Sequence, residues 1–261
     1  MSDINNIERF RSRMLEGKIC VGTSVQMTDP IASELAAEAG NDFIWYEMEH
    51  SYLDVAGLAA HLMALRGTQA ASIVRVAWND PVIMKPILDL APAAIVVPMI
   101  RTADEALRAV QACRYPPEGQ RGFGPIRNMY GMSSMKEYLE IAPQQTMVYA
   151  QVEHIDAVRN LDAILTTPGL DGIVLGRNDL SGSLGKLGQH SDPELLEAIE
   201  TVFTKARETD LFVGVSIGPD LDTVRAWRDK GVHWFALGED IGHIFDGSKA
   251  VADAVHQMDE L

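Results

Sequence analysis

The sequence has few cysteines and no long apolar stretch, and these two absences exclude several classes of protein. Cys20 and Cys113 are the only cysteines among 261 residues, so a disulfide framework is not expected. No segment approaches the roughly 18 consecutive apolar residues of a membrane helix, and the first residues lack the apolar core of a signal peptide. We therefore expect a protein of the reducing cytoplasm, with no membrane partner.

Basic residues are outnumbered, and lysines are few. The chain carries 22 Lys and Arg against 37 Asp and Glu, a net charge of −15, which would repel nucleic acid and anionic membranes. The expected partners are therefore small molecules. None of the lysines follows a predicted strand directly, although Lys186 in a loop at the rim stays a possibility. This pattern disfavours an aldolase that forms a Schiff base with its substrate.

Short apolar runs alternate with helical patterns along the whole chain. Helices are predicted over 30–39, 80–90 and 102–113, the last opening Thr-Ala-Asp-Glu like a capping box. Alternation of strands with helices predicts a parallel sheet, and eight strands predict a closed (β/α)8 TIM barrel in a single domain, 1–261. An open doubly wound sheet is the alternative. The predicted strands are 18–25, 43–48, 72–77, 94–98, 146–152, 171–175, 212–216 and 232–237.

One connection of the predicted barrel is much longer than the others. About thirty residues rich in Gly, Pro and Arg, 115–145, separate the fourth strand and its helix from the fifth strand. Inserted loops of this kind often line a site or a subunit contact. We expect this insertion and a neighbouring subunit to influence the choice of substrate.

Polar side chains gather where the predicted strands end. In a (β/α)8 barrel the active site lies at the C-terminal ends of the strands. Each such residue alone could be a hydrogen-bonded strand end or a helix cap, as for His50 or Asp179. A histidine, an arginine and two carboxylates on one rim favour a catalytic site. The rim residues are Ser24, Gln26, Glu47, Glu49, His50, Arg75, Gln151, Glu153, Asn178, Asp179 and Ser216.

Two of these residues form a candidate metal site. Glu153 and Asp179 end consecutive strands, so their carboxylates reach the same rim and can share one divalent cation. Oxygen ligands favour Mg²⁺ or Mn²⁺, and the sequence has no His-x-x-x-His or Cys-x-x-Cys pair typical of zinc sites. A 2-oxo acid could chelate such a metal. Arg75 would then stabilise the developing oxyanion while His50, oriented by a nearby acid, moves the proton.

These residues stand in segments that match a known family. The chain resembles the HpcH/HpaI aldolase family, the class II metal-dependent pyruvate aldolases, along nearly its whole length. The resemblance implies a (β/α)8 barrel whose last helix packs on a neighbouring subunit, in a homohexamer that is a trimer of dimers. The matching segments include Asp42-Phe-Ile-Trp-Tyr-Glu-Met-Glu-His50, Arg75-Val-Ala-Trp-Asn-Asp80, Gln151-Val-Glu153 and Gly172-Ile-Val-Leu-Gly-Arg-Asn-Asp-Leu-Ser181.

The resemblance also implies roles for the rim residues. Mg²⁺, Mn²⁺ or Co²⁺ would be held by Glu153 and Asp179, with His50 as base and Arg75 on the enolate oxygen. The implied reaction is reversible aldol cleavage of 4-hydroxy-2-oxo acids to pyruvate or hydroxypyruvate plus an aldehyde, through a metal-bound enolate. Glu47 would assist His50, and the substrate would contact Gln151, Gly176, Arg177, Asn178 and Ser216.

The sequence departs from the family pattern at three positions. Glu47 stands where many members have Asp, and Arg177-Asn178 replaces the common Pro-Ala before the metal-binding aspartate. Arg127 is a further extra cation. Arg127 and Arg177 indicate a polar donor such as hydroxypyruvate or an acidic acceptor, and ion pairs at a surface or interface would explain them equally well. The alternative functions are a 2-oxo acid decarboxylase, an acyl-CoA lyase, or a non-catalytic barrel that serves as a binding protein.

Overall fold

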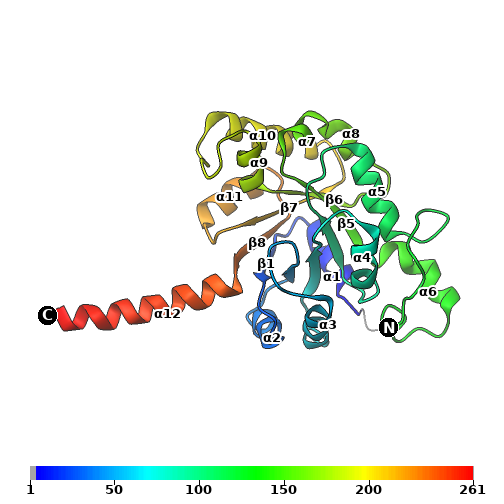
Figure 1. Ribbon diagram of the computed structural model, residues 1–261, viewed down its shortest axis with the longest axis horizontal. Coiled ribbons are helices and arrows are strands. Elements are labelled where there is room, and N and C mark those ends of the chain that lie inside the picture. Colours follow the sequence, from blue (N-terminus) through cyan, green and yellow to red (C-terminus); the bar gives the residue numbers. More distant parts are fainter. Residues whose placement is uncertain (1–3, 261) are drawn as a thin grey trace.

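The computed structural model describes residues 4–260 and contains a closed barrel of eight parallel strands (Figure 1). Each strand pairs with the next along the chain, and β8 pairs with β1, which excludes the open sheet. The predicted TIM barrel is therefore confirmed, and every predicted strand bound lies within two residues of the observed one. The strands are β1 Cys20–Val25, β2 Phe43–Glu47, β3 Ala71–Arg75, β4 Ala94–Val97, β5 Met147–Val152, β6 Gly172–Leu175, β7 Phe212–Ile217 and β8 Trp234–Glu239.

Helices follow the strands and form the outer layer (Figure 1). Their starts are encoded locally: Asp80 accepts a hydrogen bond from the Val82 N–H at 2.7 Å, and Thr102 with Glu105 forms a complete capping box. The three predicted helices are confirmed. The helices are α2 Ile31–Glu38, α3 Val55–Ala64, α4 Pro81–Leu88, α5 Ala103–Cys113, α6 Met135–Ile141, α7 Ile155–Arg159, α8 Leu161–Leu165, α9 Arg177–Ser183, α10 Pro193–Ala206 and α11 Leu221–Asp229.

Aromatic side chains fill the inside of the barrel. The ring of Trp234 lies 5.3 Å from Phe43, 5.8 Å from Trp45 and 5.6 Å from Tyr149, measured between ring centroids. This packing requires a glycine on the neighbouring strand, because a Cβ on Gly214 would lie 1.8 Å from the Trp234 ring. The interior is therefore a packed core, which confines any ligand to the ends of the strands.

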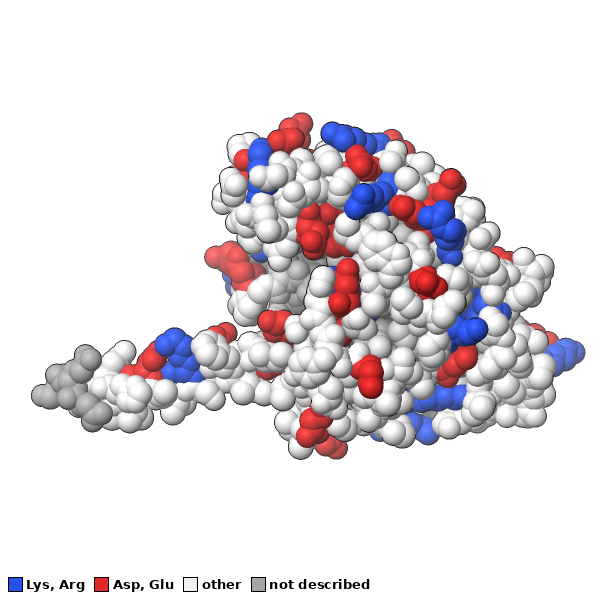
Figure 2. Space-filling view, viewed as in Figure 1, with Lys and Arg blue, Asp and Glu red and all other residues white. Residues whose placement is uncertain are grey.

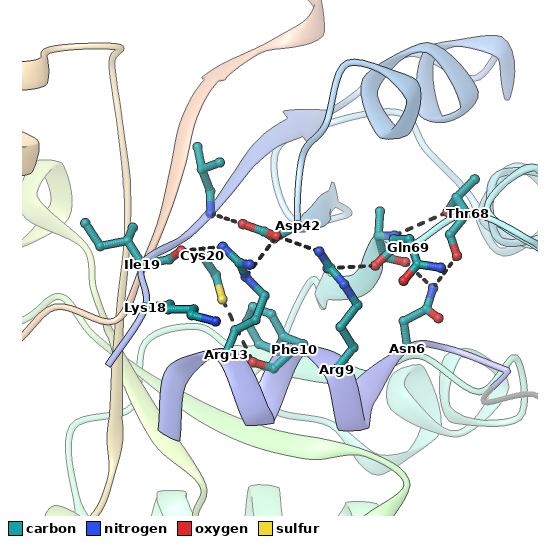
Figure 3. Close-up of polar contacts among 12 residues, drawn as sticks. Asn6, Arg9, Phe10, Arg13, Lys18, Ile19, Cys20, Asp42, Thr68 and Gln69 are labelled. Atoms are coloured by element: carbon teal, nitrogen blue, oxygen red, sulfur yellow. Dashed lines mark hydrogen bonds and ion pairs between the residues drawn. The ribbon is translucent and has the colours of Figure 1, made fainter. Parts of the chain in front are cut away.

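A helix that the sequence analysis did not predict, α1 Ile7–Leu15, adds its apolar face to this interior core. Asp42, at the start of β2, anchors it through ion pairs with Arg9 at 3.2 Å and Arg13 at 3.0 Å (Figure 3). The same carboxylate accepts a hydrogen bond from the Val21 N–H at 3.1 Å. The N-terminal end of the barrel is thus covered by a structural element, and the opposite end is left for ligands.

The last helix, α12 Asp240–His256, extends away from the barrel and continues into a short 3₁₀ helix, η2 Gln257–Glu260 (Figure 1). Apart from Asp240 and the partly buried Gly242, the helix is exposed to solvent in the single chain. On the face in Figure 2, acidic and basic side chains are interspersed over the barrel surface. Within residues 4–260, no helix has both the length and the apolar character needed to cross a bilayer.

Candidate active site

A cavity of about 430 Å³ opens at the C-terminal ends of the strands. It brings together residues that lie far apart in the sequence and that were predicted to share a rim. Glu153 is the one predicted site residue that does not line it, because its carboxylate lies beneath the side chain of Gln151 and the backbone of Gly176. The predicted residues that line the cavity are Glu47, His50, Arg75, Gln151, Gly176, Arg177, Asn178, Asp179 and Ser216.

Glu47 holds the β2 and β3 ends of the site together. Its Oε2 accepts hydrogen bonds from Arg75 Nε at 2.7 Å and from Trp45 Nε1 at 3.1 Å, and Arg75 Nη2 forms an additional close ion pair. Its Oε1 accepts from the backbone N–H groups of Glu49 at 2.8 Å and His50 at 3.1 Å. Every acceptor position of this buried carboxylate is therefore used to fix Arg75 and the loop that carries His50.

The acid closest to the His50 imidazole is Glu49. His50 Nε2 lies 3.6 Å from Glu49 Oε2, and this same oxygen lies 3.1 Å from Arg75 Nη1. The Glu49 oxygen has no hydrogen-bond partner, and burial raises the pKa of its carboxyl group. The imidazole itself is 64% exposed and lines the cavity. The sequence analysis gave the assisting role to Glu47, whereas the structure brings Glu49 to the imidazole.

Glu153 is a buried carboxylate with other carboxylates nearby. It is 2% exposed, and its oxygens accept hydrogen bonds from the Met99 N–H at 2.7 Å and from Gln151 Nε2 at 2.6 Å. Burial, with the negative charges of Glu49 and Asp179, raises the pKa of Glu153 to about 7. Gln151 Oε1 is buried without a hydrogen-bond partner. This end of the cavity therefore has several nearby carboxylates and an amide oxygen without a hydrogen-bond partner, with little positive charge to compensate them.

The turn between β6 and α9 forms another wall. A Cβ on Gly176 would lie 2.5 Å from Glu153 Oε2, so only glycine lets this turn pass so close to the carboxylate. Beyond it, Arg177, Asn178 and Asp179 line the cavity. The turn that leads to Asp179, in the first turn of α9, is thus packed directly against Glu153, which follows β5.

Arg127 does not belong to this site in the single chain. Its guanidinium donates hydrogen bonds to the carbonyl oxygens of Leu62 and Leu90, near the ends of α3 and α4. It also borders a small cavity with Asn6 and Ala70, at the N-terminal ends of the strands. None of residues 115–145 lines the cavity described above. Within its own chain the insertion therefore does not line the cavity, because it folds against the opposite end of the barrel, and its influence on the substrate together with a neighbouring subunit stays a prediction.

Several cavity residues were absent from the predicted site. Glu239 ends β8, and its side chain accepts a hydrogen bond from Gln26. Its position at the C-terminal end of a strand could have identified it from the sequence. His190 lies in the loop between α9 and α10, and its sequence position carries no comparable signal. It reaches the cavity through a contact between its Nε2 and Asn178 Oδ1 at 2.9 Å.

Among the described residues, no group of three or more His, Cys, Asp or Glu side chains could enclose a metal ion. A site made of two carboxylates is a different case, because it leaves most coordination positions to water and substrate oxygens.

Known proteins are similar to this chain in sequence and in architecture. Residues 22–246 match the family model described as HpcH/HpaI aldolase/citrate lyase. The chain is 34% identical over 248 residues to a 5-keto-4-deoxy-D-glucarate aldolase of Citrobacter koseri, covering 94% of this chain and 95% of that one.

Solved structures agree with this assignment. A family protein from Burkholderia cenocepacia has a TM-score of 0.88 at 28% identity, over 95% of this chain and 99% of that chain. The citrate synthase SbnG has a TM-score of 0.86 at 27% identity, over 96% and 98%. The chain therefore belongs to the HpcH/HpaI aldolase/citrate lyase family and is a carbon–carbon lyase.

Proposed function

We propose that the protein is a divalent-cation-dependent aldolase that reversibly cleaves 4-hydroxy-2-oxo acids into pyruvate or hydroxypyruvate and an aldehyde. The observation that carries the proposal is the buried carboxylate of Glu153, which feels the charge of Asp179 and lies beneath a cavity lined by Asp179, His50 and Arg75. The similarity to a 5-keto-4-deoxy-D-glucarate aldolase supports the same reaction type.

The residues at the Glu153 end of the cavity fit a hard cation. Carboxylate and amide oxygens are the ligands that Mg²⁺, Mn²⁺ and Co²⁺ accept, and Glu153, Asp179 and Gln151 offer them. The raised pKa of Glu153 and the unpartnered Gln151 Oε1 mark a place where a positive charge would be stabilised. When bound, such a cation supplies Lewis-acid stabilisation to the oxygen atoms of a 2-oxo acid.

The protein's own groups would then manage the proton and the developing charge. In cleavage, a base removes the proton of the 4-hydroxyl group, the C3–C4 bond breaks, and the aldehyde leaves. The electron pair of that bond forms the enolate of the 2-oxo acid, which is protonated at C3. We assign the proton transfers to the exposed imidazole of His50, directly or through a water, and the enolate oxygen to the guanidinium of Arg75.

The remaining cavity residues are assigned to substrate binding. The backbone of the turn from Gly176 to Asp179 would hold the 2-oxo acid carboxylate, while Ser216 lines the wall formed by β7. Arg75 is kept in one orientation by Glu47, so it costs little to order when a substrate binds.

Chelation and three substitutions test this proposal. Excess EDTA should abolish release of pyruvate, and added Mn²⁺ or Mg²⁺ should restore it. Glu153→Ala and Asp179→Ala should lose Mn²⁺ binding in isothermal titration, whereas His50→Ala should bind Mn²⁺ and lose turnover. Asp156→Ala is the matched control, because Asp156 is only partly buried and pairs with Arg159 outside the cavity. Full activity in EDTA would contradict the proposal, and CO₂ release without aldehyde exchange would favour the decarboxylase.

We also propose that α12 is an oligomer contact, in a homohexamer. The exposed apolar side chains of this helix and of η2 fall on one stripe, which is exposed to solvent in a single chain. Light scattering after gel filtration should give a hexamer for the whole chain and a smaller species for Phe245→Glu. A monomer at all concentrations of the whole chain would exclude this assembly. The stripe consists of Ile241, Ile244, Phe245, Val251, Val255 and Met258.

A further inference from the structure

Arg177 is a cation of the cavity wall that has no anionic partner. Its side chain is partly buried, and its Nε is buried without a hydrogen-bond partner. Within residues 4–260 it forms no ion pair, whereas Arg75 across the cavity contacts both Glu47 and Glu49. Burying an uncompensated charge is unfavourable, so this arrangement is expected where an anion binds.

The Arg177 guanidinium lies against an aromatic side chain of the outer helices. It lies 5.9 Å from the ring centroid of Trp227 on α11, and that ring packs edge-on against Phe203 of α10. Burial lowers the pKa of Arg177 and the charge of Asp220 raises it, but Asp220 itself accepts hydrogen bonds from Thr223 Oγ1 and from the Asp222 N–H. Stacking therefore fixes the guanidinium, while its donors stay available to a ligand.

Asn178 supplies a second donor beside it. Because a carboxamide oxygen only accepts, the contact with His190 means that His190 Nε2 donates to Asn178 Oδ1. Asn178 lines the cavity, and its amide nitrogen has no hydrogen-bond partner among the described residues. Burial and the charge of Arg177 lower the pKa of His190.

We propose that Arg177 and Asn178 form a subsite for a carboxylate at the aldehyde end of the substrate, with His190 as a positioning residue. This inference rests on the proposed aldolase function. The 2-oxo acid group would lie near Glu153, which follows β5, and Asp179, in the first turn of α9. Arg177 reaches outward from the same turn toward α11, so the group that it meets is the distal part of a longer substrate. Arginine forks match carboxylates, and the chain would prefer acidic over neutral aldehydes.

Pairs of aldehydes that differ in charge test the subsite. Addition of pyruvate to glyoxylate is compared with addition to glycolaldehyde, and succinic semialdehyde is compared with butanal, using the Mn²⁺-loaded full chain. Arg177→Met keeps the length of the side chain and removes the charge. The preference is the ratio of kcat/KM for the acidic aldehyde to kcat/KM for its neutral partner. We expect this ratio to fall about 10- to 100-fold in Arg177→Met, mainly because KM for the acidic aldehyde rises. This is the size of effect expected when a hydrogen bond to a charged group is lost.

Further variants separate charge from structure. Arg177→Lys should retain part of the preference, because it keeps the charge but loses the fork. His190→Gln, which retains an N–H donor, should keep more of it than His190→Leu. Arg228→Met is the matched control, because Arg228 is exposed, pairs with Asp229 and does not line the cavity. Its preference ratio should equal that of the wild type.

Three outcomes would overturn the inference and are distinguishable from a failure of the proposed function. Equal losses for both members of each pair, or no loss, would remove the distal-carboxylate role while leaving an aldolase. A raised KM for pyruvate with every aldehyde would assign Arg177 to the 2-oxo acid instead. A wild-type protein without aldol activity toward any aldehyde would remove the proposed function itself.

Discussion

Glu47→Gln should weaken the fold and the active site together, although the substitution changes only one atom of the side chain. The carboxylate accepts from four donors: Arg75 Nε and Trp45 Nε1 on one oxygen, and the N–H groups of Glu49 and His50 on the other. A glutamine has one oxygen. If that oxygen keeps the two backbone N–H groups, its NH₂ group faces the Arg75 and Trp45 donors.

The magnitude follows from the bonds that are lost. A hydrogen bond to the charged Arg75 contributes about 1.5–3 kcal/mol, and the neutral bond to the indole contributes about 0.5–1.5 kcal/mol. Their sum is about 3 kcal/mol, and removing one partner of a buried ion pair costs about 3–5 kcal/mol. For a chain of this length, about 2 °C in Tm corresponds to 1 kcal/mol, so we expect a decrease of about 6 °C.

Urea unfolding followed by circular dichroism, together with thermal melting, measures this change. Glu49→Gln is the matched control: it also contacts Arg75, but its Oε2 has no hydrogen bond and burial already disfavours its charged form. We expect the control to change the free energy of unfolding by less than about 1 kcal/mol. Equal destabilisation by the two variants, or a Glu47→Gln variant as stable as the wild type, would refute the reasoning.

Two further predictions concern buried groups away from the cavity. His61 donates from Nε2 to the Met27 carbonyl oxygen at 2.9 Å and contacts Ser33 Oγ through Nδ1 at 2.7 Å, and burial lowers its pKa. The unfolded chain therefore takes up a proton near pH 6.5 that the folded chain resists, so stability should fall as pH drops below about 6.5. Urea titrations at pH 7.5 and 5.5 should show a smaller loss for His61→Gln, and equal losses would contradict the assignment. Gly214→Ala places a Cβ 1.8 Å from the Trp234 ring and should lower stability by about 3 kcal/mol or prevent folding. Gly218→Ala, which meets no atom within 4 Å, should melt near the wild-type temperature.

The oligomer proposal and the distal-carboxylate subsite have separate physical origins. The oligomer proposal rests on the apolar stripe of α12 and η2, which is exposed to solvent in one chain. The subsite rests on the Arg177 guanidinium, whose buried Nε has no hydrogen-bond partner. A hexamer without a preference for acidic aldehydes would support the oligomer contact and refute the subsite. A smaller assembly that keeps this preference would support the subsite and refute the hexamer.

The fold class was predictable because it depends on local periodicity. Apolar runs of strand length alternate with capped helices, and those patterns need no knowledge of distant contacts. Closure of the barrel follows from eight such units, and strand ends then define one rim. This is why His50, Arg75, Gln151 and Asp179 could be placed around one cavity from their sequence positions alone.

Only the tertiary structure decided which of these side chains contact one another. Glu47 and Glu49 stand two residues apart at the end of one strand, yet one carboxylate is used by four donors and the other approaches His50. The path of the 115–145 segment carries Arg127 to the opposite end of the barrel, while Arg177 reaches the cavity wall. Such differences depend on side-chain direction and loop path, which arise from packing between distant segments and leave no periodic signal in the sequence.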